Sequence, residues 1–439
     1  MDSFPDLRVI VGLPPENSFG GQAYEYGIVC IETLRRLGLS IMAITAEEWE
    51  DLNLRAGALD RAKRFDPNFA IAIPQAGYGL RFKGVAQENL FTDILGVPLV
   101  LPWDHLLTQA PTYFLEHMYT ASQQPGALSE IRRGLMRPLN RHYCPDSGHV
   151  EIYEKLGLLS PGIAKTYVPS GVREFVTAGL RKAEPTICGR VAFAGNIYTA
   201  QGTKLKLLEH ELMRQIDTAL LDAKRRNWRT SGWFLLLDIL EQLPLEFRER
   251  NGLTPDYPLF WWLALDLLSF RVNTDFRLCV LDAIDASVDF YGNFVDPESS
   301  LSGCRSDHIR FCGSVPYRSM PELFRQYEVW VDVTNAPFIR GCGAKVYHCF
   351  VAGSFMLIDY KEDVRNEIGA LAERFMYRDA QDLNDKIGYY LSHPQERMEV
   401  VEEVQSIVRV RLKWEDFFAR VCADMTAELQ GERAAASPM

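Results

Sequence analysis

The sequence predicts an α/β protein with two parallel-sheet domains that face one another across a cleft. The chain has 439 residues, more than one compact core usually holds. Short apolar runs typical of buried strands alternate with amphipathic segments of helical period in both halves of the chain. A long stretch at about 203–270 has helical spacing and few strand signals, which predicts a helical insertion in the second domain.

The first half repeats a strand–helix–strand pattern. Residues 7–14 have the pattern of a buried strand, 23–37 that of an amphipathic helix ended by Gly38, and 39–45 that of a second strand. Such a unit implies a right-handed crossover and hence a parallel sheet. Further strand candidates follow at 68–74, 97–102, 141–144 and 166–168. We therefore predict a first Rossmann-like domain over residues 1–183.

The second half begins after a polar, proline-containing linker at 173–190. Strands are predicted at 190–195, 288–292, 309–313, 328–333 and 354–358, with helices at about 319–326, 343–352 and 361–371 and one long helix at about 394–429. These elements predict a second Rossmann-like domain over residues 184–430, with the insertion after its first strand. The tryptophans of the insertion (Trp228, Trp233, Trp261 and Trp262) are expected in a core, with partner binding as the alternative.

Composition and charge exclude several classes of protein. A hydrophobic content of 47% with 24% charged residues is ordinary for a folded protein, and the net charge of −11 disfavours a nucleic-acid partner. The nine cysteines form no CxxC pair, which fits a reducing compartment. The first residues lack a basic-then-apolar signal, and no run reaches about 18 uncharged apolar residues. We expect a cytoplasmic protein without a transmembrane segment.

A glycine-bearing helix start follows the predicted strand at 328–333. Free backbone N–H groups and the helix dipole at such a start favour an anion, typically a phosphate. Gly341 and Gly343 allow close approach of the backbone, and Lys345 adds positive charge in the first turn. A cation there is unfavourable for the helix itself, and an anionic ligand would explain it. The alternative is a glycine turn with a solvated lysine.

Residues 345–353, KVYHCFVAG, together with the strand that follows them, resemble the donor-site signature of the spore-maturation-type (CgeB-like) glycosyltransferases. These are proteins of the GT-B fold with a C-terminal domain like that of glycosyl transferases group 1. Further segments similar to the family are 193–196, 290–292, 312–317, 379–383, 387–391, 394–397, 97–104 and 168–171. The resemblance covers nearly the whole chain, and its specific part is 312–391. It implies an enzyme of glycan biosynthesis that transfers a sugar from a nucleotide-diphosphate donor, bound by the second domain, to an acceptor hydroxyl at the first.

The resemblance also implies a set of donor contacts. The family usually has glutamate at the place of His348 and more often arginine at the place of Lys345. The glutamate holds the donor ribose, the basic residue faces the diphosphate, backbone donors after the first strand lie near the phosphates, and the loop at 313–317 reads the base. A neutral His348 could accept one ribose hydrogen bond, a protonated one could meet phosphate, and the side chain could instead only pack on its helix. The predicted donor site is Gly195, Asn196, Gly313, Tyr317, Gly341, Cys342, Gly343, Lys345 and His348.

Two further groups are expected at the cleft from the first domain. Gly20 and Gly21 follow its first strand and would face donor or acceptor. Asp104 and His105 follow another strand, where either could remove the proton of the acceptor hydroxyl in an inverting transfer. Asp104 could instead cap the next helix. Glu16, His117 and His149 are other possible bases, and a retaining transfer would need none, so the stereochemistry stays open.

No motif of another chemistry is present in the sequence. There is no GxSxG, GxxxxGK[ST] or HExxH motif, and no aspartate pair of the DxD type at a strand end. We therefore expect no metal and no cofactor apart from a UDP- or GDP-linked sugar as co-substrate, with the helix start and basic side chains stabilising the departing diphosphate. A nucleotide-sugar epimerase of the same fold, or a non-catalytic scaffold or adaptor subunit, is the alternative. The acceptor could be a protein, a lipid-linked glycan or a small molecule.

Overall fold

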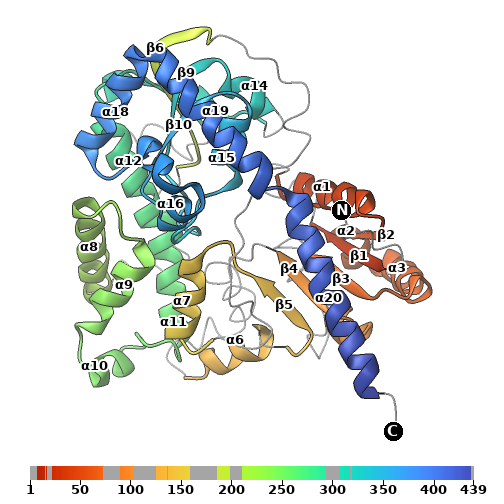
Figure 1. The fold of residues 1–439 in the computed structure, drawn as a ribbon. Helices are drawn as coiled ribbons and strands as arrows, with labels where there is room; N and C mark the ends of the chain where they lie inside the picture. The colour runs from red at the N-terminus through yellow and green to blue at the C-terminus, as the bar shows by residue number, and fades with distance from the viewer. Residues whose placement is uncertain are drawn as a thin grey trace.

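The computed structural model describes residues 7–14, 16, 22–72, 89–102, 125–135, 137–158, 185–197, 210–292, 306–316 and 319–436. They form two lobes, each built on one sheet (Figure 1). Every pair of neighbouring strands in the described residues is parallel. The prediction of two parallel-sheet α/β lobes is thus confirmed.

The first lobe has a five-stranded sheet in the order β2-β1-β3-β4-β5. Its strands are β1 (Arg8–Leu13), β2 (Ser40–Thr45), β3 (Phe69–Ala72), β4 (Leu99–Pro102) and β5 (Asn140–Tyr143). Its helices are α1 (Gln22–Arg36), α2 (Ala46–Glu50), α3 (Leu52–Phe65), the π-helical η1 (Leu90–Ile94), α6 (Ala127–Leu135) and α7 (Ser147–Lys155). The strand predicted at 166–168 lies outside the described residues. The continuous apolar runs of β3 and β4 are completely buried, as expected for the central strands of a parallel sheet.

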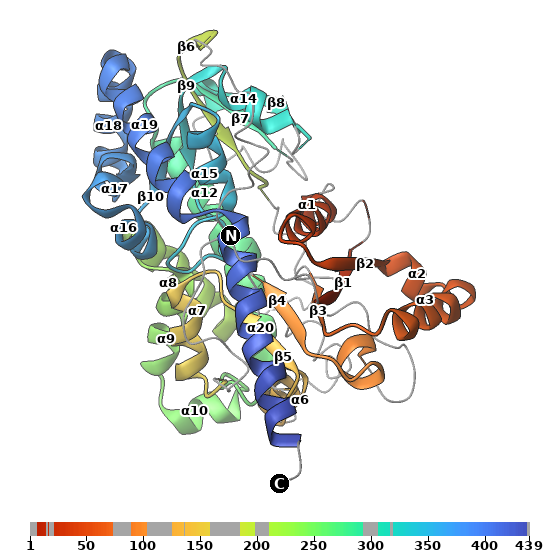
Figure 2. The same cartoon turned by 45° about the vertical axis from the view of Figure 1, so that its right-hand side comes forward.

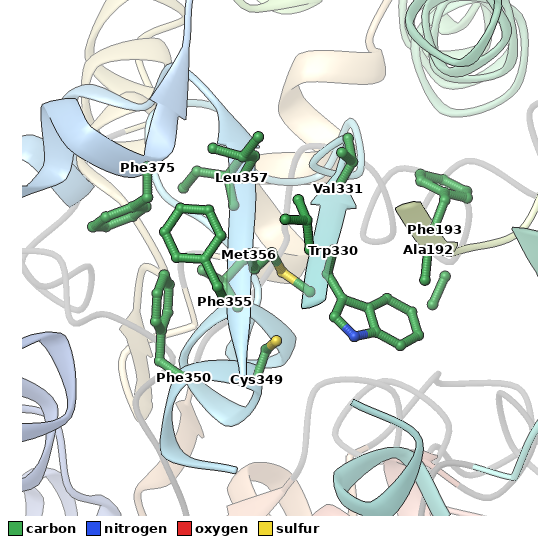
Figure 3. Close-up of a cluster of buried hydrophobic side chains, with 14 of the residues drawn as sticks. Ala192, Phe193, Trp330, Val331, Cys349, Phe350, Phe355, Met356, Leu357 and Phe375 are labelled. Atoms are coloured by element: carbon green, nitrogen blue, oxygen red, sulfur yellow. The ribbon is translucent and has the colours of Figure 1, made fainter. Parts of the chain in front are cut away.

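The second lobe has a six-stranded sheet in the order β11-β10-β9-β6-β7-β8. Its strands are β6 (Ile187–Ala194), β7 (Val288–Tyr291), β8 (Ile309–Gly313), β9 (Tyr327–Asp332), β10 (Phe355–Asp359) and β11 (Met376–Tyr377). Its helices are α14 (Met320–Phe324), α15 (Ala344–Val351), α16 (Glu362–Ile368), α17 (Ala372–Phe375), α18 (Ala380–Ser392) and α19 (Pro394–Arg411). Cys349 and Phe350 of α15 pack toward Phe355 and Met356 of β10 (Figure 3). This contact fixes α15 against the sheet and so positions its N-terminal end.

The helical insertion occupies the chain between β6 and β7. It comprises α8 (Glu211–Arg226), α9 (Gly232–Glu241), α10 (Leu245–Arg250), α11 (Pro258–Ala264), the π-helical η6 (Leu265–Val272) and α12 (Asn273–Ala283). All four of its tryptophans are buried, in agreement with the core interpretation. Trp233 and Trp261 share one apolar cluster with Ile152 and Tyr153 of α7, so the insertion packs on the first lobe as well. None of the described helices is both long and apolar enough to cross a membrane.

The single long helix predicted at 394–429 is wrong, because the structure has two helices there. α19 ends at Arg411, and α20 (Trp414–Ala436) crosses to the first lobe and lies beside it (Figure 2). Trp414 packs edge-on against Tyr26 of α1, with ring centroids 5.3 Å apart. Glu415 pairs with Arg36 at 2.7 Å. The apolar pattern continues through the break because α20 has a different core to cover, and periodicity alone cannot show that change of partner. The predicted domain boundaries themselves stay predictions.

Candidate functional site

The carboxyl edges of the two sheets meet. The chain leaving β5 enters α7, and the Asp146 carboxylate there accepts a hydrogen bond of 2.8 Å from the Ile339 backbone N–H, which follows β9. Ser147 donates to Asp363, just after β10, through its N–H and its hydroxyl, both at 2.7 Å. Ligands of open parallel sheets bind outside the carboxyl ends of the strands. The junction of the lobes is therefore where a functional site is expected.

Three glycines end neighbouring strands at this edge of the second sheet. Gly195 follows β6 and donates its N–H to Tyr291 at 2.9 Å, and Gly292 follows β7 and donates to Gly313 of β8 at 3.0 Å. Gly292 has a φ of +154°, and a Cβ there would lie 1.8 Å from the Gly195 carbonyl oxygen. Only glycine fits, so the backbones approach closely without side chains between them. Gly195 and Gly313 were predicted site residues. Gly292 is not among the predicted site residues, although the predicted strand at 288–292 ends in this glycine and could have indicated it.

Lys345 lies at the same edge, in the first turn of α15. Its ammonium donates to the Ala194 carbonyl at 2.5 Å and pairs with the carboxylate of Asp332, the last residue of β9. The Lys345 side chain is 25% exposed, and that of Asp332 is 4% exposed. Gly343 is the N-cap, and no described side chain caps this helix start. The structure thus brings Lys345 to the end of β6, next to the predicted site residue Gly195.

The turn before α15 is more closed than the sequence suggests. Gly341 and Cys342 are buried. A Cβ at Gly341 would lie 2.8 Å from the Cβ of Asp146, so this glycine is explained by the contact between the lobes. Burial raises the pKa of the Cys342 thiol well above its usual value. Gly343 and Lys345 remain half-buried and are the part of the predicted phosphate turn that a ligand can reach.

His348 is 3% exposed, on the packed face of α15. Its neighbour Tyr347 is also buried and donates its hydroxyl to Glu367 at 2.8 Å. The burial of His348 agrees with the packing alternative, and a contact with the ribose of a donor stays a prediction.

Arg277 of α12 is a residue that sequence reasoning missed. It is 4% exposed and donates to the Asn196 carbonyl at 2.5 Å and to the Val333 carbonyl at 3.2 and 3.3 Å. It therefore joins the backbone after β6 to the backbone after β9. An isolated arginine in an amphipathic helix gives no sign of this role in the sequence, because solvated arginines have the same pattern.

Several predicted residues lie outside the described part of the chain. They are Gly20, Gly21, Asp104, His105, His117 and Tyr317. Glu16 is exposed. His149 is completely buried, and its Nδ1 lies 3.0 Å from the Asp146 carboxylate. Burial opposes ionisation of Asp146, but the charge of His149 and the hydrogen bonds to the carboxylate outweigh it and lower the pKa of Asp146 to about 2. His149 thus belongs to the contact between the lobes.

Among the described residues, no group of three or more His, Cys, Asp or Glu side chains is placed to hold a metal ion. The carboxylates at the carboxyl edge of the second sheet are already engaged: Asp332 pairs with Lys345, and Asp359 lies 3.3 Å from the Lys361 ammonium. The expectation of a metal-free site remains a prediction.

Part of the chain matches a known protein family, and the whole chain is similar in structure to known proteins. Residues 277–423 match the family described as glycosyl transferase-like. Sucrose-phosphate synthase from Thermosynechococcus elongatus is similar in structure, with 11% identity, 98% of this chain and 100% of that chain covered, and a TM-score of 0.50. A glycosyltransferase from Rickettsia africae has 10% identity, coverage of 96% and 99%, and a TM-score of 0.50. HepE from Anabaena, in complex with UDP and glucose, has 10% identity, coverage of 98% and 100%, and a TM-score of 0.47. No protein with a curated description matches the sequence.

The likeness to the first two structures extends over nearly all of each chain and shows a shared two-lobed fold. The family match begins in α12, covers most of the second lobe and ends within α20, and it includes Arg277, Asp332 and Lys345. The predictions of a GT-B fold and of a glycosyltransferase are confirmed at this level: the chain shares the two-lobed fold of these structures, and residues 277–423 match the glycosyl transferase-like family.

Proposed function

We propose that the chain transfers a sugar from a UDP- or GDP-linked donor to an acceptor hydroxyl, without a metal ion and in the cytoplasm. The resemblance of residues 345–353 to the donor-site signature supports a place in the spore-maturation-type group of these enzymes. One observation carries the proposal. The Lys345 ammonium is fixed at the end of β6, at the edge of the sheet where β6, β7 and β8 end in glycine.

Lys345 is suited to stabilise a departing diphosphate. Its ammonium has three N–H donors, of which the Ala194 carbonyl and the Asp332 carboxylate engage two in the described structure. The third is left for a phosphate oxygen. Asp332 holds the ammonium in place, and the start of α15 adds the positive end of a helix dipole. A charge that is already positioned stabilises the developing negative charge without reorganisation during the reaction.

The first lobe would supply the acceptor site and the base. Asp104 and His105 follow β4, whose carboxyl end belongs to the edge that meets the second lobe. Either side chain has the chemistry to take the proton of the acceptor hydroxyl as the sugar is transferred. The pair remains part of the proposal, together with Gly20 and Gly21.

A thermal-shift panel of nucleotides in the presence of a chelator tests the donor site. A ligand at about 100 times its Kd stabilises the folded state by about 2.7 kcal/mol, so UDP or GDP is expected to raise the Tm by several degrees without metal. Lys345→Met should abolish most of this shift, whereas Lys63→Met on the exposed face of α3 should keep it. The absence of a shift with every nucleotide in the unchanged protein would contradict the proposal.

The scaffold alternative is favoured by one observation, the buried His348 where the family has glutamate. A scaffold could keep the nucleotide site yet not transfer the sugar. Release of UDP or GDP from nucleotide sugars, measured with and without a mixture of acceptors, separates the two functions. Nucleotide binding without any donor turnover would establish the scaffold.

A further inference from the structure

A small cavity lies between the insertion and the carboxyl edge of the second sheet. Its polar lining includes Lys224 of α8, Ser231 before α9, Trp233 of α9, Asn273 of α12, Thr334 after β9, Asp359 at the end of β10, and Lys361. The cavity measures about 30 Å³. This volume holds roughly two water molecules.

Three of these side chains have a polar atom without a hydrogen-bond partner among the described residues. They are the indole N–H of Trp233, the amide nitrogen of Asn273 and the hydroxyl of Thr334. All three side chains are more than nine-tenths buried. A buried polar group without a partner costs about 1–3 kcal/mol and is rare in native proteins. Two of the three groups can only donate, so the cavity is suited to an occupant that accepts hydrogen bonds.

The charges around the cavity favour the same kind of occupant. Lys224 donates to the Trp228 and Thr230 carbonyls at 2.6 and 2.9 Å, and Lys361 lies 3.3 Å from the Asp359 carboxylate. Two ammonium groups thus face one carboxylate. The first turn of α9, Gly232 and Trp233, also lines the cavity and adds the positive end of its helix dipole.

We propose that this cavity binds a small oxyanion, with a carboxylate as the best fit. The two oxygens of a carboxylate would take the places of two waters and accept from Trp233 and Asn273. Lys224 and Lys361 would balance its charge. The inference is separate from the proposed sugar transfer, because it concerns binding at a cavity that contains neither Lys345 nor the glycine-ended strands.

The affinity of the cavity for an anion should depend on pH, because Lys224 must be protonated when the anion binds. Burial lowers the pKa of Lys224 to about 7, the Asp359 carboxylate opposes this shift, Lys361 adds to it, and the Cys279 thiol opposes it slightly. A bound anion stabilises the ammonium form. Below about pH 7 the cation is already present, whereas above it binding must take up a proton, so the affinity should fall up to tenfold per pH unit.

Calorimetric titration of the full chain with formate tests the proposal. Saturable millimolar binding is expected at about pH 6 and weaker binding at about pH 8. Repeating the titration in buffers of different ionisation enthalpy measures the proton uptake at the higher pH. Lys224→Met should remove this uptake. Absence of saturable heat at both pH values, or the same uptake in Lys224→Met, would overturn the proposal.

A matched pair of variants checks the location of the site. Asn273→Asp keeps the oxygen that accepts from Ala336 at 3.2 Å but replaces the amide donor by a negative charge. It should weaken formate binding at least tenfold. Asn53→Asp makes the same charge change on exposed α3 and should leave binding unchanged. Equal binding in both variants would place the ion elsewhere and overturn the proposal.

The source of the carboxylate is tested with two ligands. If formate and glucuronate both bind and both lose affinity in Asn273→Asp, the cavity accepts the acid group of a sugar. If only formate does so, the cavity holds a free ion. Either result supports an oxyanion site, whereas binding of neutral formamide as tightly as formate would reject it.

Discussion

Two ion pairs near the carboxyl edges of the sheets differ in how far they are exposed to solvent. In the first, which we call the lobe clamp (Asp146, His149 and the Ile339 N–H), the Asp146 and His149 side chains are completely buried and bonded to one another. In the second, Lys345 is 25% exposed above a buried Asp332. No ligand can reach the completely buried lobe clamp, so its role is to hold the two lobes together. The Lys345 pair is partly open, which fits its proposed role in binding a ligand.

The lobe clamp should give the largest effect on stability. Asp146→Ala leaves the N–H groups of Ile339 and His149 without their acceptor and removes the partner of the imidazole. The free energy of unfolding should fall by about 3–5 kcal/mol, measured by denaturant titration. Asp60→Ala on the exposed face of α3 should change it by less than about 0.5 kcal/mol. Equal losses of unfolding free energy in the two variants would show that the lobe clamp does not stabilise the fold.

Lys345 should show the reverse pattern, with a large effect on function and a small one on folding. Removing one preorganised donor from a developing anion costs about a hundredfold in rate, or about 2.7 kcal/mol. Lys345→Met should therefore lower kcat/KM about a hundredfold, and Lys345→Arg should retain most of it. The double variant Lys345→Met with Asp332→Asn removes the buried unpaired charge and checks that the loss is not one of folding. Full activity of Lys345→Met would assign the diphosphate contact to other residues.

The glycine-ended strands offer a graded test of the same edge. A Cβ at Gly292 would lie 1.8 Å from a backbone oxygen, whereas Gly313, with a φ of +83°, has open space around its Cβ position. Gly292→Ala should shift the backbone and lower both the Tm and nucleotide binding. Gly313→Ala should cost only about 1 kcal/mol of backbone strain. If both variants kept the same Tm and nucleotide binding, the close approach of β6 and β7 would not be needed for the site.

Lowering the pH below about 4 should weaken the lobe clamp gradually. The Asp146 pKa of about 2 lies below the ordinary value of 3.8, so its contribution to stability is present above about pH 4 and is lost as the pH falls toward 2. Over that window the unchanged protein should lose up to about 1.4 kcal/mol per pH unit from this group, and Asp146→Asn should show a shallower slope. Denaturant titrations at successive pH values measure both slopes.

Local patterns predicted most of the fold and only part of the site. The buried runs of β3, β4 and β9 and the glycine at the start of α15 depend on near neighbours, so they can be inferred from the sequence. The partner of Gly341 is Asp146, far away along the chain, and no local pattern reports such a contact. Arg277 and Asp332 were missed for the same reason, since their roles depend on which strand ends lie side by side.

The return of α20 to the first lobe has a consequence for how the protein folds during synthesis. Trp414, Phe418 and Cys422 belong to the same core cluster as Val29 and Leu34 of α1. The face of α1 is therefore translated early, but the residues that cover it are made only after the whole second lobe. Until then the nascent chain exposes an apolar surface that is open to chaperones and to aggregation.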